Sequence, residues 1–454
     1  MFTLAVCLSR LSRVLKGRGR LALHGRVALY LREPFAVAKI AKRGNRRSAR
    51  PAVPVVSREK RPLRQIGEGL QAGLASTKWR TAPPLEHRVA LYFHRLSRKG
   101  GGAERMICLL ANALCERGFA VHMITWDDPD ARANYTLNPQ IVWNRLGFSP
   151  GVTDKLRRTR ALCQLLHDQR ISVLVGFVMS GDKTVYAAAK LAGVRLIVAE
   201  RSAPTIYHLR YGFTQRWLSF RMLYLADRIT VQIPDFVTGY PASLRGRIEV
   251  IPNPVPVARC RARPNQPGPH GHFNLLTAGR LEAEKRYECL VSAFARIAHY
   301  HPHWHLRILG DGPKRETLHG LAVQGGVAER VSLERWTSDI SSAYVSSHLF
   351  VMSSLWEGFP NALAEAMSHG LPAVGFRNAA GVAQLITDGE TGWLVDGLDP
   401  EAGLAQVLSA AMADGAERSR RGARAAESMA IYAPEAQFDR WARLLSTVMD
   451  ETVP

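Results

Sequence analysis

Short apolar runs alternate with amphipathic stretches along the chain from about residue 87 onward. Four of these runs have the length and texture of buried strands: residues 89–93, 121–125, 171–178 and 195–199. Between the first two, residues 103–116 have the pattern of a helix with a buried side made of Met106, Leu109, Leu110 and Leu114. Strands and helices in alternation predict a parallel sheet that helices cover on both faces.

A second series of the same kind follows residues 261–272, a stretch rich in Pro, Gly and His that predicts a linker. Its expected strands are residues 273–277, 305–309, 348–352, 371–374 and, after a turn at residue 388, the run up to residue 395. The last predicted helix covers residues 434–449. We therefore expect two α/β domains, residues 87–255 and 256–430, between an extension (1–86) and a final segment (431–454).

The most distinctive stretch, residues 353–367, joins an apolar run to the start of a predicted helix. Gly358 lets the backbone approach a ligand closely, and Pro360 suits a first helical turn because its missing N–H costs nothing there. Glu357 lies in the loop and Glu365 about two turns into the helix. Each carboxylate accepts two hydrogen bonds at once, so the pair predicts a clamp for the diols of a sugar and a ribose. An ordinary strand–loop–helix unit with solvated glutamates is the alternative.

Length and composition agree with a globular protein of two domains. The 454 residues exceed what a single hydrophobic core usually serves. No run of 18 apolar residues occurs, so no spanning helix is expected. The six cysteines form no Cys-x-x-Cys pair, which argues against a zinc site or a disulfide framework and favours a reducing cytoplasm.

Positive charge is concentrated before the first domain. Residues 1–88 carry 20 Lys and Arg against 4 Asp and Glu, which supplies 16 of the net charge of +23. Leu8, Leu11 and Leu15 accompany the basic residues at helical spacing, so residues 1–50 are candidates for contact with an anionic membrane surface. A disordered tail, or translation from an upstream start codon, stays open as an alternative. The scarcity of aromatic residues argues against nucleic-acid binding.

Two basic residues, Arg280 and Lys285, lie near the start of the second domain, between the predicted strand at residues 273–277 and the following helix. Arg280 offers a guanidinium that grips a diphosphate with two bonds, and Lys285 adds a point charge. Ligands of open parallel sheets bind at such strand ends. The two residues are therefore candidates for neutralising a leaving nucleoside diphosphate without a metal. Surface charges flanking a helix start are the alternative.

Residues 353–367 resemble the Glu-x7-Glu signature of the retaining glycosyltransferases of family 4, which use nucleotide sugars. The resemblance implies that Glu357 meets the donor sugar and Glu365 the ribose. The family's Gly-Phe-Pro-Asn loop, whose backbone holds sugar hydroxyls, matches Gly358, Phe359, Pro360 and Asn361. From about residue 88 onward the resemblance implies the GT-B fold, two facing Rossmann-like doubly wound domains whose last helix crosses back to the first.

Other motifs of that family also have counterparts. The stretch at residues 279–285 matches its Gly-Arg-Leu-x-x-Glu-Lys, with Arg280 and Lys285 in catalytic roles beside Glu357. Residues 101–105 resemble its Gly-Gly-Ala-Glu-Arg loop, which implies that Gly101 and Gly102 approach the donor phosphates. The dinucleotide pattern Gly-x-Gly-x-x-Gly is absent there.

The acceptor side is less clearly marked. Glu200 and Arg201 resemble the Ser-Glu-Arg-x-x-Pro stretch of bacterial relatives that transfer hexose or N-acetylhexosamine onto lipid-linked glycans. His94 and His208 are candidates for the family's cleft histidine, with a packed or surface histidine as the alternative.

These expectations combine into one hypothesis with two alternatives. The chain is expected to transfer a sugar from a nucleotide diphosphate sugar to a lipid-linked or polysaccharide acceptor, in the cytoplasm or peripherally on the inner membrane. Neither a metal nor another cofactor is expected, and nucleic acid is not an expected partner. The alternatives are a nucleotide-sugar epimerase of the same fold and a non-catalytic protein that binds through its basic extension.

Overall fold

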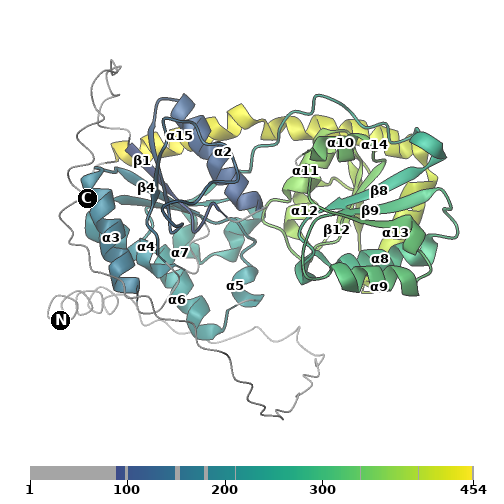
Figure 1. Ribbon diagram of the computed structural model, residues 1–454, viewed down its shortest axis with the longest axis horizontal. Coiled ribbons are helices and arrows are strands. Elements are labelled where there is room, and N and C mark those ends of the chain that lie inside the picture. Colours follow the sequence, from purple (N-terminus) through teal and green to yellow (C-terminus); the bar gives the residue numbers. More distant parts are fainter. Residues whose placement is uncertain are drawn as a thin grey trace, which may run out of the picture. The chain divides into compact units, whose positions relative to one another are not determined.

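The computed structural model describes residues 88–97, 101–148, 154–177, 182–209, 211–337, 339–396 and 398–451. The expectations for residues 1–86 lie outside this range. Within it the chain forms two parallel sheets, one of seven strands and one of six, each with helices on its faces (Figure 1). This confirms the predicted fold class of two Rossmann-like domains.

The first sheet has the strand order β3-β2-β1-β4-β5-β6-β7. Its strands are β1 (Arg88–Tyr92), β2 (Ala120–Thr125), β3 (Val142–Arg145), β4 (Val173–Phe177), β5 (Arg195–Ala199), β6 (Arg228–Val231) and β7 (Ile248–Val250). Every neighbouring pair is parallel. The order reverses between β1 and β4, and ligands of such sheets bind beside the strand ends at this switch point.

Helices connect these strands: α2 (Gly102–Glu116), α3 (Lys155–Asp168), α4 (Lys183–Ala192), α5 (Ile206–Leu209), α6 (Phe213–Leu223) and α7 (Ala242–Arg245). α4 begins where the Asp182 side chain accepts a hydrogen bond from the Thr184 N–H, and it ends at the left-handed Gly193. In α2 the expected buried side is wrong at one position, since Leu109 is exposed. The buried arc is centred on Ile107, Ala111 and Leu114, and at 100° per residue Leu109 points away from it.

The second sheet has the order β10-β9-β8-β11-β12-β13. Its strands are β8 (Phe273–Ala278), β9 (Trp304–Leu309), β10 (Val331–Glu334), β11 (Leu349–Met352), β12 (Ala373–Phe376) and β13 (Gly392–Val395). The helices are α8 (Tyr287–Ile297), α9 (Arg315–Gln324), α10 (Ile340–Val345), α11 (Asn361–Ser368), α12 (Ala380–Leu385), α13 (Pro400–Ala413) and α14 (Gly415–Ser428). α11 begins one residue after Pro360, so this proline precedes the helix instead of sitting in its first turn.

The last helix, α15 (Pro434–Asp450), packs on the first domain although it follows the second in sequence. Its predicted apolar side, with Phe438, Trp441, Leu444 and Leu445, is buried together with residues of β1 and β4. The Trp441 ring lies 6.1 Å from the Phe177 ring at the end of β4. The chain passes between the two domains twice, near Val255 and near Tyr432. These two segments are joined by a hydrogen bond, since the Val255 N–H donates to the Tyr432 carbonyl over 2.8 Å.

Trp441→Ala should therefore loosen the attachment of α15. We expect the free energy of unfolding, measured by urea titration with circular dichroism, to fall by about 3–5 kcal/mol, as for other buried aromatic truncations. Trp336→Ala is the matched control, because Trp336 is exposed in the second domain and its truncation should change stability by less than about 0.5 kcal/mol. Equal effects of the two variants would show that α15 contributes nothing to stability through Trp441.

Candidate active site

The loop between β11 and α11, residues 353–360, is anchored to the segment between β8 and α8. The Ser353 hydroxyl donates to the Lys285 carbonyl over 2.6 Å, and the Leu355 N–H donates to the Glu284 carbonyl over 2.9 Å. Both segments follow neighbouring parallel strands of the second sheet. Because the carboxyl ends of parallel strands meet at one edge, residues about 70 positions apart in sequence come together here.

Glu357 forms an ion pair inside this junction. Its Oε1 lies 2.6 Å from the Lys285 Nζ and also accepts from the Ser354 hydroxyl over 2.6 Å. Burial opposes the charge on Lys285, but the Glu357 carboxylate outweighs it, so the pKa of Lys285 lies above its usual value. The structure thus brings together two of the three predicted catalytic side chains as a charged, largely buried pair.

Glu365 lies one turn into α11 and is buried. Its carboxylate forms an ion pair with Arg105, which comes from α2 of the first domain, and accepts from the Tyr344 hydroxyl over 3.3 Å. Burial disfavours the charge on Arg105, yet Glu365 raises its pKa above the ordinary value. Burial, followed by the nearby Glu365, raises the pKa of Tyr344 well above the ordinary value, so this phenol stays a hydrogen-bond donor.

Arg280, the third predicted catalytic residue, differs from Lys285 in its surroundings. Its side chain is 60% exposed and pairs with Glu282 over 2.9 Å and with Glu284 over 3.9 Å. Its charge lies close enough to Lys285 to oppose slightly the elevated pKa of that residue. A side chain that exposed can reorient toward a diphosphate at little cost.

The predicted Gly-Phe-Pro-Asn loop approaches the first domain closely. A Cβ atom at Gly358 would overlap the Arg201 carbonyl oxygen, and one at Gly102 would lie 2.9 Å from the Asn361 Nδ2. Asn361 in turn accepts a hydrogen bond from Asn253 over 2.8 Å. Gly358 is therefore needed for space, because a side chain there would meet the backbone of Arg201, whereas at Gly102 only the end of the Asn361 side chain would have to move.

Two other predicted donor-binding residues, Phe359 and Gly101, have structural contacts in this structure. The Phe359 ring is buried, with its centre 5.4 Å from that of the Tyr432 ring. It therefore packs against the segment around Tyr432 instead of facing solvent. The Gly101 carbonyl receives the N–H of Arg105 over 3.2 Å at the start of α2, so its segment positions the arginine that pairs with Glu365.

The acceptor-side candidates of the first domain are distributed among several environments. Glu200 is buried, accepts from the Tyr207 hydroxyl over 2.8 Å, and has its pKa raised by burial. The Arg201 guanidinium stacks on Phe177 and Trp441, and burial lowers its pKa to about 9. These two side chains pack inside the first domain. The part of this segment that contacts Gly358 is the Arg201 backbone carbonyl.

Of the two histidines, only His208 lines a cavity. His94 is half-buried after β1, and its carbonyl accepts the Trp126 N–H over 3.1 Å. His208 is exposed on α5 and receives a hydrogen bond from Arg216 over 3.0 Å.

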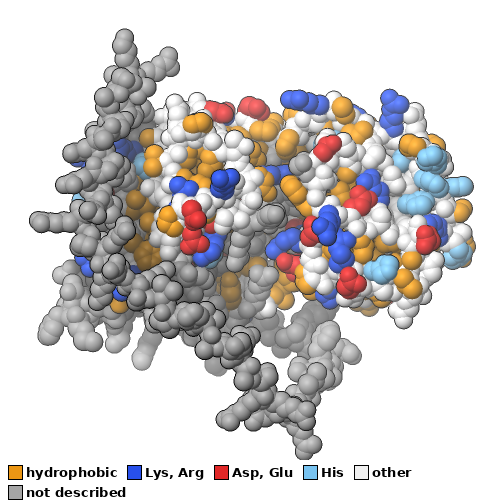
Figure 2. Space-filling view, in the orientation of Figure 1, with side chains coloured by type: hydrophobic (Ala, Val, Ile, Leu, Met, Phe, Trp, Pro, Cys, Tyr) orange, Lys and Arg blue, Asp and Glu red, His pale blue; other side chains and the backbone are white. Residues whose placement is uncertain are grey.

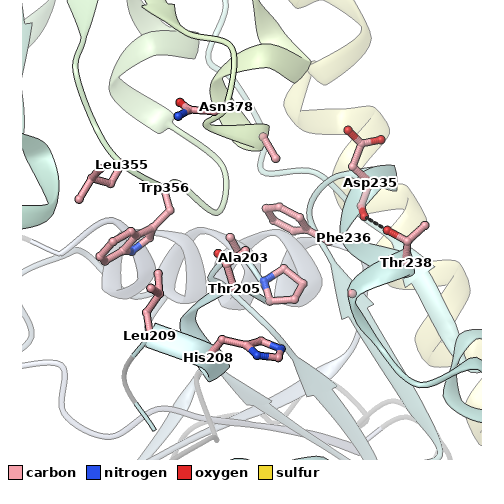
Figure 3. A pocket seen from close by; sticks show the side chains of 13 residues that line it. Ala203, Thr205, His208, Leu209, Asp235, Phe236, Thr238, Leu355, Trp356 and Asn378 are labelled. Atoms are coloured by element: carbon pink, nitrogen blue, oxygen red, sulfur yellow. Dashed lines mark hydrogen bonds between the residues drawn. The ribbon is translucent and has the colours of Figure 1, made fainter. Parts of the chain in front are cut away.

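That cavity has a volume of about 360 Å³ and is lined by both domains (Figure 3). In Figure 3 the first domain contributes Thr205, His208 and Phe236, and the second contributes Trp356 and Asn378. Trp356 precedes Glu357 directly, which connects the cavity to the ion pair with Lys285. Sequence reasoning did not select these lining residues apart from His208, although the position of Trp356 beside Glu357 was an available signal.

Metal ligation has no support among the residues that the structure describes. Histidines gather on one side of the second domain (Figure 2), but no three His, Cys, Asp or Glu side chains of the described ranges are arranged to hold an ion.

Two family models match the chain, one for each domain. The model described as "Glycosyltransferase Family 4" matches residues 100–259, and the one described as "Glycosyl transferases group 1" matches residues 272–414. An uncharacterised glycosyltransferase of Haemophilus influenzae is 28% identical over 309 residues, which cover 65% of this chain and 82% of the relative.

Two further relatives have more specific names. A lipopolysaccharide core biosynthesis glycosyltransferase of Rhizobium meliloti is 33% identical, over 38% of this chain and 49% of its own length. An N-acetylgalactosaminyltransferase of Campylobacter jejuni, named for a diphospho-undecaprenol acceptor, is 23% identical over 69% of this chain and 87% of its own length. The chain thus spans about half of the Rhizobium relative but most of the other two.

Solved structures share the fold. Sucrose-phosphate synthase from Thermosynechococcus elongatus aligns with a TM-score of 0.68 at 19% identity, over 80% of this chain and 99% of that one. The Anabaena protein HepE in complex with UDP-glucose aligns with a TM-score of 0.64 at 16% identity, over 79% and 99% of the two chains.

Lys285→Met should destabilise the chain, because it leaves the Glu357 carboxylate buried without its cation. We expect a loss of about 3–5 kcal/mol in the free energy of unfolding, measured by urea titration. In the double variant Lys285→Met/Glu357→Gln the unpaired charge is gone, so part of the loss should be recovered.

Arg296→Gln is the control for an exposed ion pair, the one with Glu401, and should cost less than about 1 kcal/mol. A Lys285→Met variant as stable as this control would contradict a buried, coupled pair.

Proposed function

The chain belongs to the glycosyltransferases of group 1 and family 4, and we propose that it transfers a sugar from a nucleotide diphosphate sugar to an acceptor hydroxyl with retention of anomeric configuration. The observation that carries the proposal is the pairing of both signature carboxylates with cations, Glu357 with Lys285 and Glu365 with Arg105. A nucleotide diphosphate sugar presents both kinds of partner, hydroxyls for the carboxylates and phosphates for the cations.

The proposed roles follow from these contacts. Glu365 accepts hydrogen bonds from the ribose hydroxyls, and Glu357 from the donor sugar. Lys285 and Arg280 bear the negative charge that develops on the departing diphosphate, as preorganised cations do in other transfer reactions. The Gly358–Asn361 segment offers backbone groups to the sugar, and its glycine keeps the loop close to the first domain.

Retention is supported by the state of the carboxylate nearest to the proposed sugar position. Glu357 is bound on Oε1 by both Lys285 and Ser354, an arrangement that orients it and lowers its nucleophilicity. With Glu357 bound in this way, attack on the same face of the sugar, with the leaving phosphate as base, fits the site. Closure of the two domains would exclude water and so limit hydrolysis of the oxocarbenium-like state.

The acceptor is proposed to be a lipid-linked or polysaccharide glycan in cell-surface polysaccharide biosynthesis. The names of the Rhizobium and Campylobacter relatives support this, as does the resemblance at Glu200 and Arg201. A cytoplasmic enzyme that associates peripherally with the inner membrane would meet such an acceptor. Across the residues described here, no helix is both long and apolar enough to span a bilayer. The matched families contain transferases, so the epimerase and the extension-driven binder are not favoured.

Calorimetry with a panel of nucleotide diphosphate sugars, without added metal, should detect one preferred donor. Glu365→Ala and Arg280→Ala should each weaken its binding about 10- to 100-fold, since each removes a charge-assisted contact of about 1.5–3 kcal/mol. Glu401→Ala and Arg296→Ala remove an exposed pair of the same domain and should leave the affinity unchanged. If the native chain bound no member of the panel, the transferase reading of this site would fail.

The stereochemistry can be tested with the donor alone. At high enzyme concentration, slow hydrolysis of an α-linked donor should release the α-anomer first, as proton NMR can detect before the free sugar equilibrates. The reason is that water would attack from the face that the leaving diphosphate occupies. Initial release of the β-anomer would contradict retention while leaving donor binding intact.

A further inference from the structure

Large apolar side chains are exposed at the end of α5 and along one side of α6 in the first domain. Leu209 is 60% exposed, Phe213 75%, Trp217 49% and Tyr224 40%. At 100° per residue, Phe213, Trp217 and Tyr224 point within about 40° of one another, so they form one stripe along α6 and the residue after it. We call these four residues the α6 stripe.

Another side of α6 packs against the domain. Ser219 and Leu223, which point about 100–140° away from the middle of the stripe, are buried. Phe220, half-buried at the edge of the stripe, has its ring 4.8 Å from the Tyr207 ring of α5. The latter contact also fixes α5 against α6, the two helices that appear together in Figure 1. The helix therefore presents a stable aromatic surface to its surroundings.

Arginines accompany the stripe, and acidic residues do not. The Arg216 guanidinium lies 5.8 Å from the Phe213 ring centre and that of Arg221 lies 5.1 Å from Trp217. Within the described part of the chain, neither arginine forms an ion pair with a carboxylate. From residue 202 to residue 226 the sequence contains no Asp or Glu. The surface is thus apolar and cationic at once.

We propose that the α6 stripe docks on the interface of an anionic lipid bilayer. Trp and Tyr side chains favour the headgroup level, Phe and Leu favour the acyl boundary below it, and arginine favours anionic headgroups. Arg216 and Arg221 can keep their charged heads in the interface while their stems lie along the rings. A two-fold contact with a second copy would instead bring like-charged arginines together, with no carboxylate of the stripe to offset them.

Docking in this way would bring the membrane to the cavity between the domains. Leu209 belongs to the stripe and lines the cavity, and His208 beside it receives a hydrogen bond from Arg216 over 3.0 Å. A lipid-linked acceptor could then enter the cavity from the bilayer plane toward Trp356 and Glu357. This last step rests on the proposed transferase function, whereas docking itself does not.

The test is co-sedimentation of the full-length protein with vesicles of phosphatidylcholine, alone or with an equal part of phosphatidylglycerol, in about 0.1 M salt. Phe213→Ser/Trp217→Ser changes two exposed side chains, so folding should be preserved, as thermal unfolding would verify. We expect the partition of this variant onto phosphatidylglycerol vesicles to be at least tenfold weaker than that of the native chain. Trp336→Ser, which removes an exposed tryptophan of the second domain, should partition like the native chain.

Three results would overturn the proposal. The first is a native chain that shows no partition, and the second is a double variant that partitions like the native chain, which would show that the stripe does not carry membrane binding. Alternatively, light scattering may show a native dimer that the double variant loses without any change in vesicle binding, which assigns the stripe to a second copy. Donor binding by calorimetry is independent of all three, so failure of docking and failure of the transferase proposal can be told apart.

Discussion

The buried carboxylate of Glu365 is the constraint on which the arrangement of the two domains depends. A carboxylate in such a place needs a cation and hydrogen-bond donors, and an unpaired one would cost several kcal/mol. Arg105 supplies the cation from the first domain, and Tyr344 supplies a hydroxyl from the second. The charge of one domain is therefore satisfied only when the other is in place. Ribose hydroxyls and phosphates could take over these partners, so the same chemistry that joins the domains suits the proposed donor.

Local spacing selected Glu357 and Lys285, which the structure brings together, but it did not indicate the partner of Glu365. Glu357, Glu365 and Lys285 lie in short segments at the ends of neighbouring strands, where a motif and its geometry coincide. Arg105 lies 260 residues before Glu365, and nothing local marks it as the partner of that carboxylate. The sequence also could not show that the Glu200 and Arg201 side chains point into the first domain and not toward the acceptor side. Whether a charged pair faces a cleft or the inside depends on which tyrosines and aromatic rings the fold brings around it.

Burial explains why several strands were predicted from the sequence and several edge strands were not. β1, β4, β5 and β11 are almost fully buried and therefore consist of continuous apolar runs. β3, β7 and β10 are edge strands with mostly exposed or half-buried residues, so they show no such run and were not predicted. Likewise Leu109 was expected on the buried side of α2, but the packed arc of this helix is centred on Ile107, Ala111 and Leu114 instead. Tertiary contact, not local preference, decides those positions.

The distribution of positive charge links the site to its surroundings. Arg105 and Lys285 are each paired with a carboxylate, Glu365 and Glu357. Arg216 and Arg221 lie over exposed aromatic rings instead, where a broad anionic surface can reach them. In the proposed function Lys285 meets the donor diphosphate, whereas Arg216 and Arg221 belong to the proposed docking surface. One sign of charge can thus serve two kinds of partner, because burial and pairing differ between the two places.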